Sequence, residues 1–225
     1  MKRLMKYKAI FSNREGAVNT MVEDLTDVSS VYCFPLTIDE VIIETDGFEE
    51  LSIAESEKYA KDQLTRFDYH ICYPYKDKNK PLLVLKDYRL DTFIPLFVRE
   101  IESGKRREAV LCIEMIHNGK DLKRTCRLFG AASSVFDMES ALVEIQEQLK
   151  DSYCMETCSN CRNSFWNPYG GNEFFNQLCF RSEAEAFQAI EEKDKMSIVR
   201  FMKYGNDRNF QNVQLTAFCD EFVPR

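Results

Sequence analysis

Five of the nine cysteines in this chain of 225 residues lie in its last third, and their spacing carries the clearest chemical signal in the sequence. Four of them follow the pattern C-x2-C-x17-C-x39-C: Cys158, Cys161, Cys179 and Cys219. A C-x-x-C loop lets two thiolates converge on one ion, and four thiolates complete either a tetrahedral zinc site or the ligand set of an iron–sulfur cluster. The sequence therefore predicts a four-cysteine metal site.

The fourth ligand and the metal each have an alternative. Cys154 lies four positions before Cys158 and could replace Cys219 in a more compact set. We favour Cys219, because an apolar-flanked segment at the chain end would be kept from fraying by a metal bond. The sequence has no C-x2-C-x2-C run of the ferredoxin kind, and zinc is favoured over a 4Fe-4S cluster because closed structural sites made only of cysteines most often hold zinc. A closed four-thiolate zinc site leaves no position for a reactive water, so we expect it to be structural.

The four remaining cysteines are scattered through the first two thirds of the chain: Cys33, Cys72, Cys112 and Cys126. We interpret them as small buried hydrophobic residues of strands. A reducing compartment favours metal binding over disulfides for the C-terminal cluster. With no signal-peptide pattern and no run of about 18 apolar residues, we expect a cytoplasmic protein without a membrane partner.

The charge balance argues against nucleic acid as a partner. The chain has 30 basic and 37 acidic side chains, a net charge of −7, which is the wrong sign for a protein that neutralises phosphates. Two basic clusters, at residues 105–107 and 120–127, are interpreted as a hairpin tip and a solvated strand face. We expect a protein partner instead.

Enzymatic chemistry has little support in the sequence. The only two histidines are His70, expected in a strand, and His117, expected in a turn beside Asn118-Gly119. No phosphate-binding loop, dinucleotide fingerprint, nucleophile elbow or zincin motif is present. We therefore expect a protein that is not an enzyme.

Residues 1–152 are predicted to form a β-rich lobe that resembles an antiparallel β-sandwich or half-barrel. Alternating or continuous apolar runs mark its strands, and Gly turns or polar loops separate several of them. The runs are Met5 to Phe11, Ser30 to Phe34, Glu40 to Thr45, Asp68 to Tyr73, Leu82 to Lys86, Thr92 to Val98 and Arg107 to Met115. A partly helical period near residues 53–64 predicts one interrupting helix.

A helix near residues 135–149, which Ser133-Ser134 can cap, is predicted to close this lobe. Its apolar stripe, which should dock on the sheet, consists of Met138, Ala141, Leu142, Ile145 and Leu149. From residue 153 to 225 the chain becomes rich in Cys, Asn, Gly and aromatic residues, with two short helices expected at 184–192, capped by Ser182 and Glu185, and at 196–204. The fold class is thus α+β, with a small C-terminal four-cysteine metal-binding lobe.

Four C-terminal segments resemble those of an uncharacterised bacterial family of unknown function. The family combines a β-rich N-terminal part, a helix ending in Ile-Gln-x-x-Leu and a C-terminal cysteine module. The matching segments are residues 158–164 (CSNCRNS), 167–172 (NPYGGN), 178–181 (LCFR) and 219–225 (CDEFVPR), with helix matches at 136–139 and 145–149. The likeness is specific from Phe129 to Arg225 and faint before, and Phe165-Trp166 departs from the Asp-Tyr pair of the pattern. The resemblance implies no known activity.

A second likeness concerns the order of the cysteines, which is similar to that of cluster-binding small subunits of glycyl-radical enzymes. It implies an iron–sulfur-cluster accessory subunit of a redox enzyme as the alternative function. Our first expectation is a non-enzymatic zinc-binding protein that acts by protein–protein interaction, in an adaptor, immunity or defence-type role.

Overall fold

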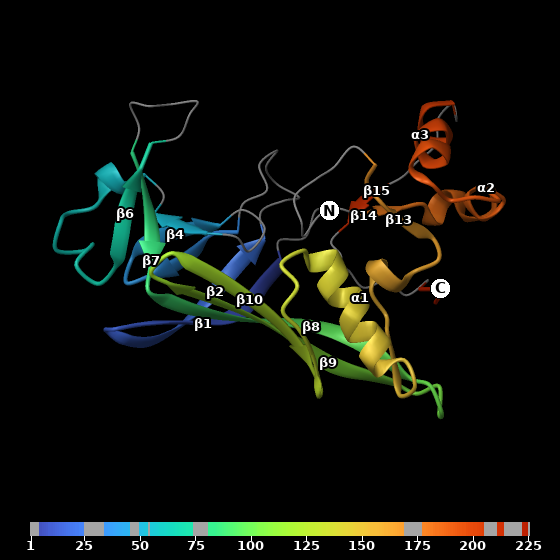
Figure 1. Cartoon of the computed structure of the whole chain (residues 1–225), viewed down its shortest axis with the longest axis horizontal. Coiled ribbons are helices and arrows are strands. Elements are labelled where there is room, and N and C mark those ends of the chain that lie inside the picture. Colours follow the sequence, from blue (N-terminus) through green and yellow to red (C-terminus); the bar gives the residue numbers. More distant parts are fainter. Residues whose placement is uncertain are drawn as a thin grey trace. The chain divides into compact units, whose positions relative to one another are not determined.

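The computed structural model describes residues 5–24, 34–45, 50–53, 55–73, 81–168, 177–204, 211–213 and 222–224 (Figure 1). Antiparallel strands dominate the described residues, and the three α-helices among them lie in the last part of the chain, between short strands. The α+β class with a β-rich part is therefore confirmed. None of the helices in the described ranges is long and apolar enough to cross a membrane.

Twelve strands form one antiparallel sheet. Their bounds are β1 Met5–Asn13, β2 Gly16–Asp24, β3 Leu36–Ile38, β4 Val41–Thr45, β5 Leu51–Ile53, β6 Asp68–Cys72, β7 Leu82–Lys86, β8 Tyr88–Glu100, β9 Arg106–Asn118, β10 Asp121–Leu128, β11 Ala131–Ser133 and β12 Tyr153–Met155. The hydrogen-bonded order is β11-β10-β9-β8-β1-β2-β3-β4-β5-β7-β6, and β12 pairs with β8 off this path. A sandwich has two packed sheets, whereas these strands follow one continuous hydrogen-bonded path, which the half-barrel alternative allows. Periodicity identifies the faces of a strand but not the neighbours at its edges, which explains the difference.

The longest strands, β8 and β9, show why these segments form a sheet with one buried face. In β8 every second residue from Tyr88 to Val98 is buried, and in β9 every second residue from Ala109 to His117 is buried. Such alternation is typical of a strand with one face in the core. Between β9 and β10 the turn at Gly119 has a φ of 66°, which glycine adopts without strain, so the predicted hairpin corner is confirmed.

By their contacts the described residues divide into two compact units. Unit 1 comprises residues 1–94 and 110–136, and unit 2 comprises residues 95–109 and 137–225. The expected boundary between residues 152 and 153 remains a prediction, because a division by contacts does not measure independent folding. All contacts described below lie within one unit.

The helix α1 (Met138–Leu149) buries the stripe that was predicted for it. Its cap differs, since the Asp137 side chain accepts a hydrogen bond from the Ser140 amide at 2.7 Å, while Ser133 belongs to β11. The other helices are α2 (Ala184–Gln188) and α3 (Lys195–Tyr204), and a second sheet contains β13 (Ser164–Trp166), β14 (Gln177–Cys179) and β15 (Gln211–Val213).

Other local expectations were wrong or fall outside the described residues. The segment near 53–64 forms a 3-10 turn at Ser56–Lys58 followed by further turns, because Ile53 belongs to the strand β5 and, of the residues described at 55–64, only Leu64 is buried. Helix α2 ends at Gln188, before the expected end at 192, and its N-cap residue is Glu183 and not the expected Ser182. The predicted strand at 30–34 lies outside the described residues except for Phe34, which is in no strand.

Candidate metal centre

The residues Cys158 to Cys161 form a tight turn, called the knuckle below. Cys158–Asn160 is a single 3-10 turn, and the Cys161 amide donates to the Cys158 carbonyl at 3.2 Å. Both cysteines are buried, at 5% and 6% exposure. The structure therefore brings the first two predicted ligands together in one turn.

Cys179 is placed beside the knuckle by the register of two short strands. It lies directly opposite Ser164 in the β13–β14 ladder, so both side chains are on the same face. The Ser164 hydroxyl contacts the carbonyl oxygens of Cys158 and of Cys161, the latter at 2.9 Å. Because Ser164 faces the knuckle, the side chain of Cys179 leaves its strand on the knuckle side.

The opposite face of the same ribbon packs against aromatic side chains. Leu178, paired with Phe165, belongs to a buried cluster with Phe180, Phe187 and Ile198. Phe180 and Phe187 stack with ring centroids 4.4 Å apart. This packing fixes which side of β14 is apolar, and Cys179 takes the other side.

The end of the chain runs back along the knuckle. Cys161 forms an isolated antiparallel bridge with Pro224, and the Arg162 amide donates to the Val223 carbonyl at 2.8 Å. Cys219 lies outside the described residues, three positions before Phe222. The chain thus returns to the knuckle shortly after the fourth predicted ligand.

The side chains are not gathered into a complete set. Within the described part of the chain, no three His, Cys, Asp or Glu side chains are grouped so that they could hold a metal ion. Cys158, Cys161 and Cys179 are thus neighbours through their backbones, and their thiols do not form such a group. The alternative ligand Cys154 is half-buried on β12, with its thiol 3.8 Å from the Met155 carbonyl and its pKa raised, chiefly by burial.

The chemistry of the knuckle suits thiolate ligands. The two buried cysteines have buried polar neighbours in the chain, namely Thr157, Ser159, Asn163 and Ser164. Amide and hydroxyl groups of this kind stabilise metal-bound sulfur by hydrogen bonding. The donor set, four cysteines with a buried C-x-x-C turn, fits zinc or an iron–sulfur cluster.

Two glutamine side chains hold the knuckle in place, and sequence reasoning gave neither of them a role at the site. Gln146 on α1 accepts from the Met155 amide at 2.8 Å and donates to the Tyr153 carbonyl at 2.9 Å. Gln188 on α2 donates to the Arg162 carbonyl and to Asn163 Oδ1. Only the Ile-Gln-x-x-Leu match at 145–149 had drawn attention to one of these positions.

The basic clusters are structural and not simply solvated. Glu156 is buried, at 2% exposure, between Arg99 and Arg106, whose Nε lies 2.8 Å from a Glu156 oxygen. In unit 1, Arg124 is buried with its guanidinium 4.4 Å from the Phe136 ring centroid. The interpretation of these clusters as a hairpin tip and solvated face was therefore incomplete, because net charge does not show where a buried carboxylate lies.

The two histidines do not converge on a common site. His70 is in the exposed strand β6, as predicted, whereas His117 is buried in β9 and stacks on Tyr88 with centroids 5.5 Å apart. The expectation of a turn residue at His117 was wrong, since β9 continues to Asn118 and the turn begins at Gly119. His117 Nδ1 is buried without a hydrogen-bond partner among the described residues.

The remaining cysteines were predicted to be buried, with mixed outcome. Cys126 is fully buried and Cys112 is half-buried, but Cys72 is exposed. Cys33 lies outside the described residues. The error at Cys72 has a physical reason, because an apolar strand at the edge of a sheet is not covered as a central strand is.

Comparison with known proteins identifies a family but no activity. No curated protein and no solved structure matches the chain. A family of unknown function, DUF6304, matches residues 5–164, which include Cys158 and Cys161 but not Cys179. The match covers the β-rich part, where the likeness was expected to be faint, and leaves out most of the C-terminal segment where it was expected to be specific. The chain belongs to this family of unknown function, as the resemblance implied.

Proposed function

We propose that Cys158, Cys161, Cys179 and Cys219 hold one structural zinc ion, and that the protein acts through protein contacts in an adaptor-type role. The observation that carries the proposal is the position of Ser164, which faces the two knuckle carbonyls while it lies opposite Cys179. A modest closure of the turn and the ribbon would bring three thiols together. The returning chain end, held at Val223 and Pro224, gives Cys219 a short path to the fourth position.

Stability gives a physical reason for a metal in this part of the chain. Among the described residues, the buried cluster on the far side of β14 consists of Leu178, Phe180, Phe187 and Ile198, with four partly buried apolar side chains packed against it. Small apolar clusters gain stability when a metal or a disulfide links the segments around them. A zinc ion bound by four thiolates would supply that stability directly, because the free energy of metal binding adds to that of folding.

The test is elemental analysis by plasma mass spectrometry of the full chain purified without oxygen, with a visible spectrum of the same sample. We expect about one zinc per chain and no visible absorbance. Cys161→Ser and Cys179→Ser should lose the zinc, and a chelator should lower the melting temperature of the parent. Cys72→Ser, an exposed cysteine of unit 1, is the matched control and should keep both the zinc and the melting temperature.

Two comparisons decide the alternatives. Loss of zinc in Cys219→Ser but not in Cys154→Ser assigns Cys219 as the fourth ligand, and the reverse assigns Cys154. If the parent contains iron and sulfide, the site holds an iron–sulfur cluster and not zinc. That result would favour the alternative function, an accessory subunit of a redox enzyme. Freshly purified protein without metal would overturn the proposal.

A further inference from the structure

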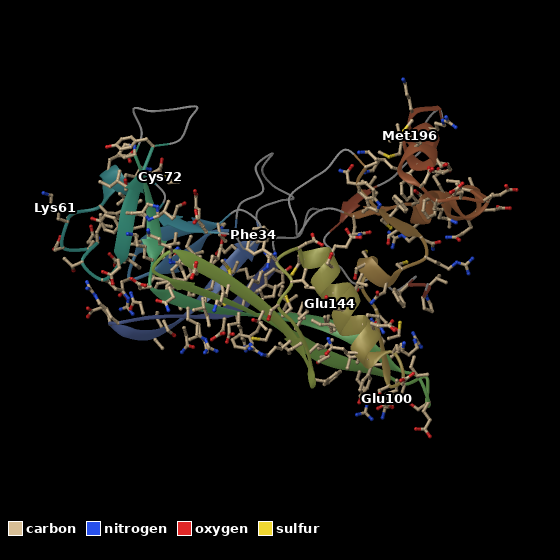
Figure 2. The ribbon with its side chains drawn as sticks, in the orientation of Figure 1. Phe34, Lys61, Cys72, Glu100, Glu144 and Met196 are labelled. Carbon is tan, nitrogen blue, oxygen red and sulfur yellow. The ribbon has the colours of Figure 1, made fainter. Side chains whose placement is uncertain are left out.

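The strand β6 is an exposed edge of the sheet in unit 1. It lies at one end of the strand order and pairs with β7, and no described strand pairs with its outer side (Figure 1). Its residues from Tyr69 to Cys72, and Tyr73 after them, are exposed on both faces, and Figure 2 marks Cys72 there. The edge backbone and the side chains around it are thus available to another strand.

Between Asp68, which begins the strand, and Pro74, which follows Tyr73, this edge lacks the features that protect sheet edges from pairing. Proteins usually place lysine, proline or a bulge in an edge strand. From Tyr69 to Tyr73 the sequence has no Lys, Arg, Asp, Glu or Pro. Asp68 to Cys72 pair one by one with Lys86 to Leu82, so no bulge interrupts the strand. Three large apolar side chains are exposed instead, with Ile71 at 55% and Tyr73 at 61%.

The pattern of these side chains matches itself under a two-fold axis. In an edge strand, the backbone N–H and C=O groups of every second residue point outward. Two residues that lie opposite each other in an antiparallel pair either both point these groups at the partner strand or both point them away. In two copies of the same strand, paired residues therefore have both odd or both even numbers, and their numbers add to an even sum. With the two-fold axis at Ile71, Ile71 lies opposite Ile71 of the partner subunit, and Tyr69 of each copy lies opposite Tyr73 of the other, which gives three apolar pairs. Centring the axis on His70 or on Cys72 leaves only two apolar pairs and places two imidazoles or two thiols opposite each other.

We propose that two copies of the chain pair antiparallel through β6, with Ile71 opposite Ile71 of the partner subunit and Tyr69 opposite Tyr73 of the partner subunit. The pairing continues the sheet across the two-fold axis and satisfies the outward backbone groups of both strands. On the other face His70 lies opposite Cys72 of the partner subunit. No like charges face each other between Tyr69 and Tyr73, so the edge accepts a second copy without repulsion. The inference stands independently of the metal site.

The test is sedimentation equilibrium of the full chain over about a 100-fold range of concentration. Ile71→Lys places two ammonium groups at the two-fold axis and should raise the dissociation constant of the dimer by about 100-fold or more. Ile42→Lys is the matched control, because Ile42 is also exposed, at 41%, but its strand β4 is paired on both sides by β3 and β5. It should leave the dimer intact.

The outcomes are distinct. If the parent is monomeric at every concentration tested, two copies do not pair through β6 and the proposal is overturned. The edge would then be open to a strand of a different protein. A dimer that survives Ile71→Lys, or one that is lost in both lysine variants, also overturns the proposal.

A cross-link tests the register separately. In a Cys72→Ser background, Ile71→Cys should form a disulfide-linked dimer on mild oxidation, since the two β-carbons at the axis approach each other closely. Tyr69→Cys in the same background should not, because its partner position is Tyr73. Cross-linking through Tyr69→Cys alone would contradict the register.

Discussion

Gln146 on α1 is hydrogen-bonded to Asn160 inside the knuckle, with Asn160 Nδ2 donating to Gln146 Oε1 at 3.0 Å. The same oxygen accepts from the Met155 amide, and the Gln146 amide donates to the Tyr153 carbonyl. One side chain therefore links the helix, the strand β12 and the turn between the first two predicted ligands. Gln146 is a positioning residue for the knuckle.

Gln146→Met keeps the length of the side chain and removes all three hydrogen bonds. Because it leaves partly buried donors and acceptors unpaired, we expect the free energy of unfolding to fall by about 1–3 kcal/mol. Hydrogen exchange of the Met155 amide, followed by mass spectrometry, should become faster. Gln148→Met, the same change at an exposed position of α1, is the control. Equal effects of the two variants would show that Gln146 acts only as a helix residue.

Glu156→Gln removes the negative charge that Arg99 and Arg106 share. The two arginines are partly exposed and can turn to water, so we expect a loss of about 1–3 kcal/mol, less than for a fully buried pair. Urea unfolding followed by circular dichroism measures this loss. Glu147→Gln breaks only the exposed ion pair with Lys150 and should change stability by less than about 0.5 kcal/mol.

The cysteines of unit 1 should differ in reactivity. Burial raises the pKa of Cys126 from 9.0 to about 11, so at about pH 8 only about one thiol in a thousand is the reactive thiolate. Cys72 is exposed on β6. We expect a short pulse of iodoacetamide to alkylate Cys72 in the native protein and to reach Cys126 only after unfolding, as read by peptide mass spectrometry. Equal rates for the two thiols would contradict the burial of Cys126.

The protein should lose stability in alkali. Burial raises the pKa of both Cys126 and Tyr88 above the ordinary values of 9.0 and 10.0. The unfolded chain therefore releases these protons first, and the stability that is complete below about pH 9 declines as the pH rises towards about 11. Urea unfolding across this range should show a shallower decline for Tyr88→Phe than for the parent. Tyr69→Phe, at an exposed position, should follow the parent.

Periodicity was sufficient for the elements that have one buried face. The stripe of α1 and the strand β7 were predicted to the residue, because burial on one side produces a clear repeat. The strand β2 was missed, since the apolar residues between Gly16 and Asp24 come in adjacent pairs and do not alternate with polar ones, and the segment is held as a strand by its neighbour β1. Pairing of this kind depends on contacts distant in sequence, which a local pattern does not contain.

The candidate site was predictable to a different extent. Cysteine spacing pointed to the knuckle, because its two predicted ligands are only three positions apart in the chain. The position of Cys179 depends on the register with Ser164, and the supports from Gln146 and Gln188 depend on packing of α1 and α2. Glutamine and serine occur throughout sequences of this kind, so their types alone give no signal.

Ser164→Ala tests whether the hydroxyl at the centre of this arrangement supports the knuckle. The substitution removes the donor that contacts the carbonyls of Cys158 and Cys161, while the backbone bonds of those carbonyls remain. We expect a loss of about 1–2 kcal/mol in the free energy of unfolding. Trp166, the only tryptophan of the chain, lies on the same strand and reports the transition by its fluorescence.

The control for this prediction is Ser152→Ala, which removes a hydroxyl at an exposed position of the same unit. It should change stability by no more than about 0.5 kcal/mol. If both variants unfold at the same denaturant concentration as the parent, the Ser164 hydroxyl does not hold the turn. The position of Cys179 beside the knuckle would then rest on the strand register alone, and the zinc content of Ser164→Ala would equal that of the parent.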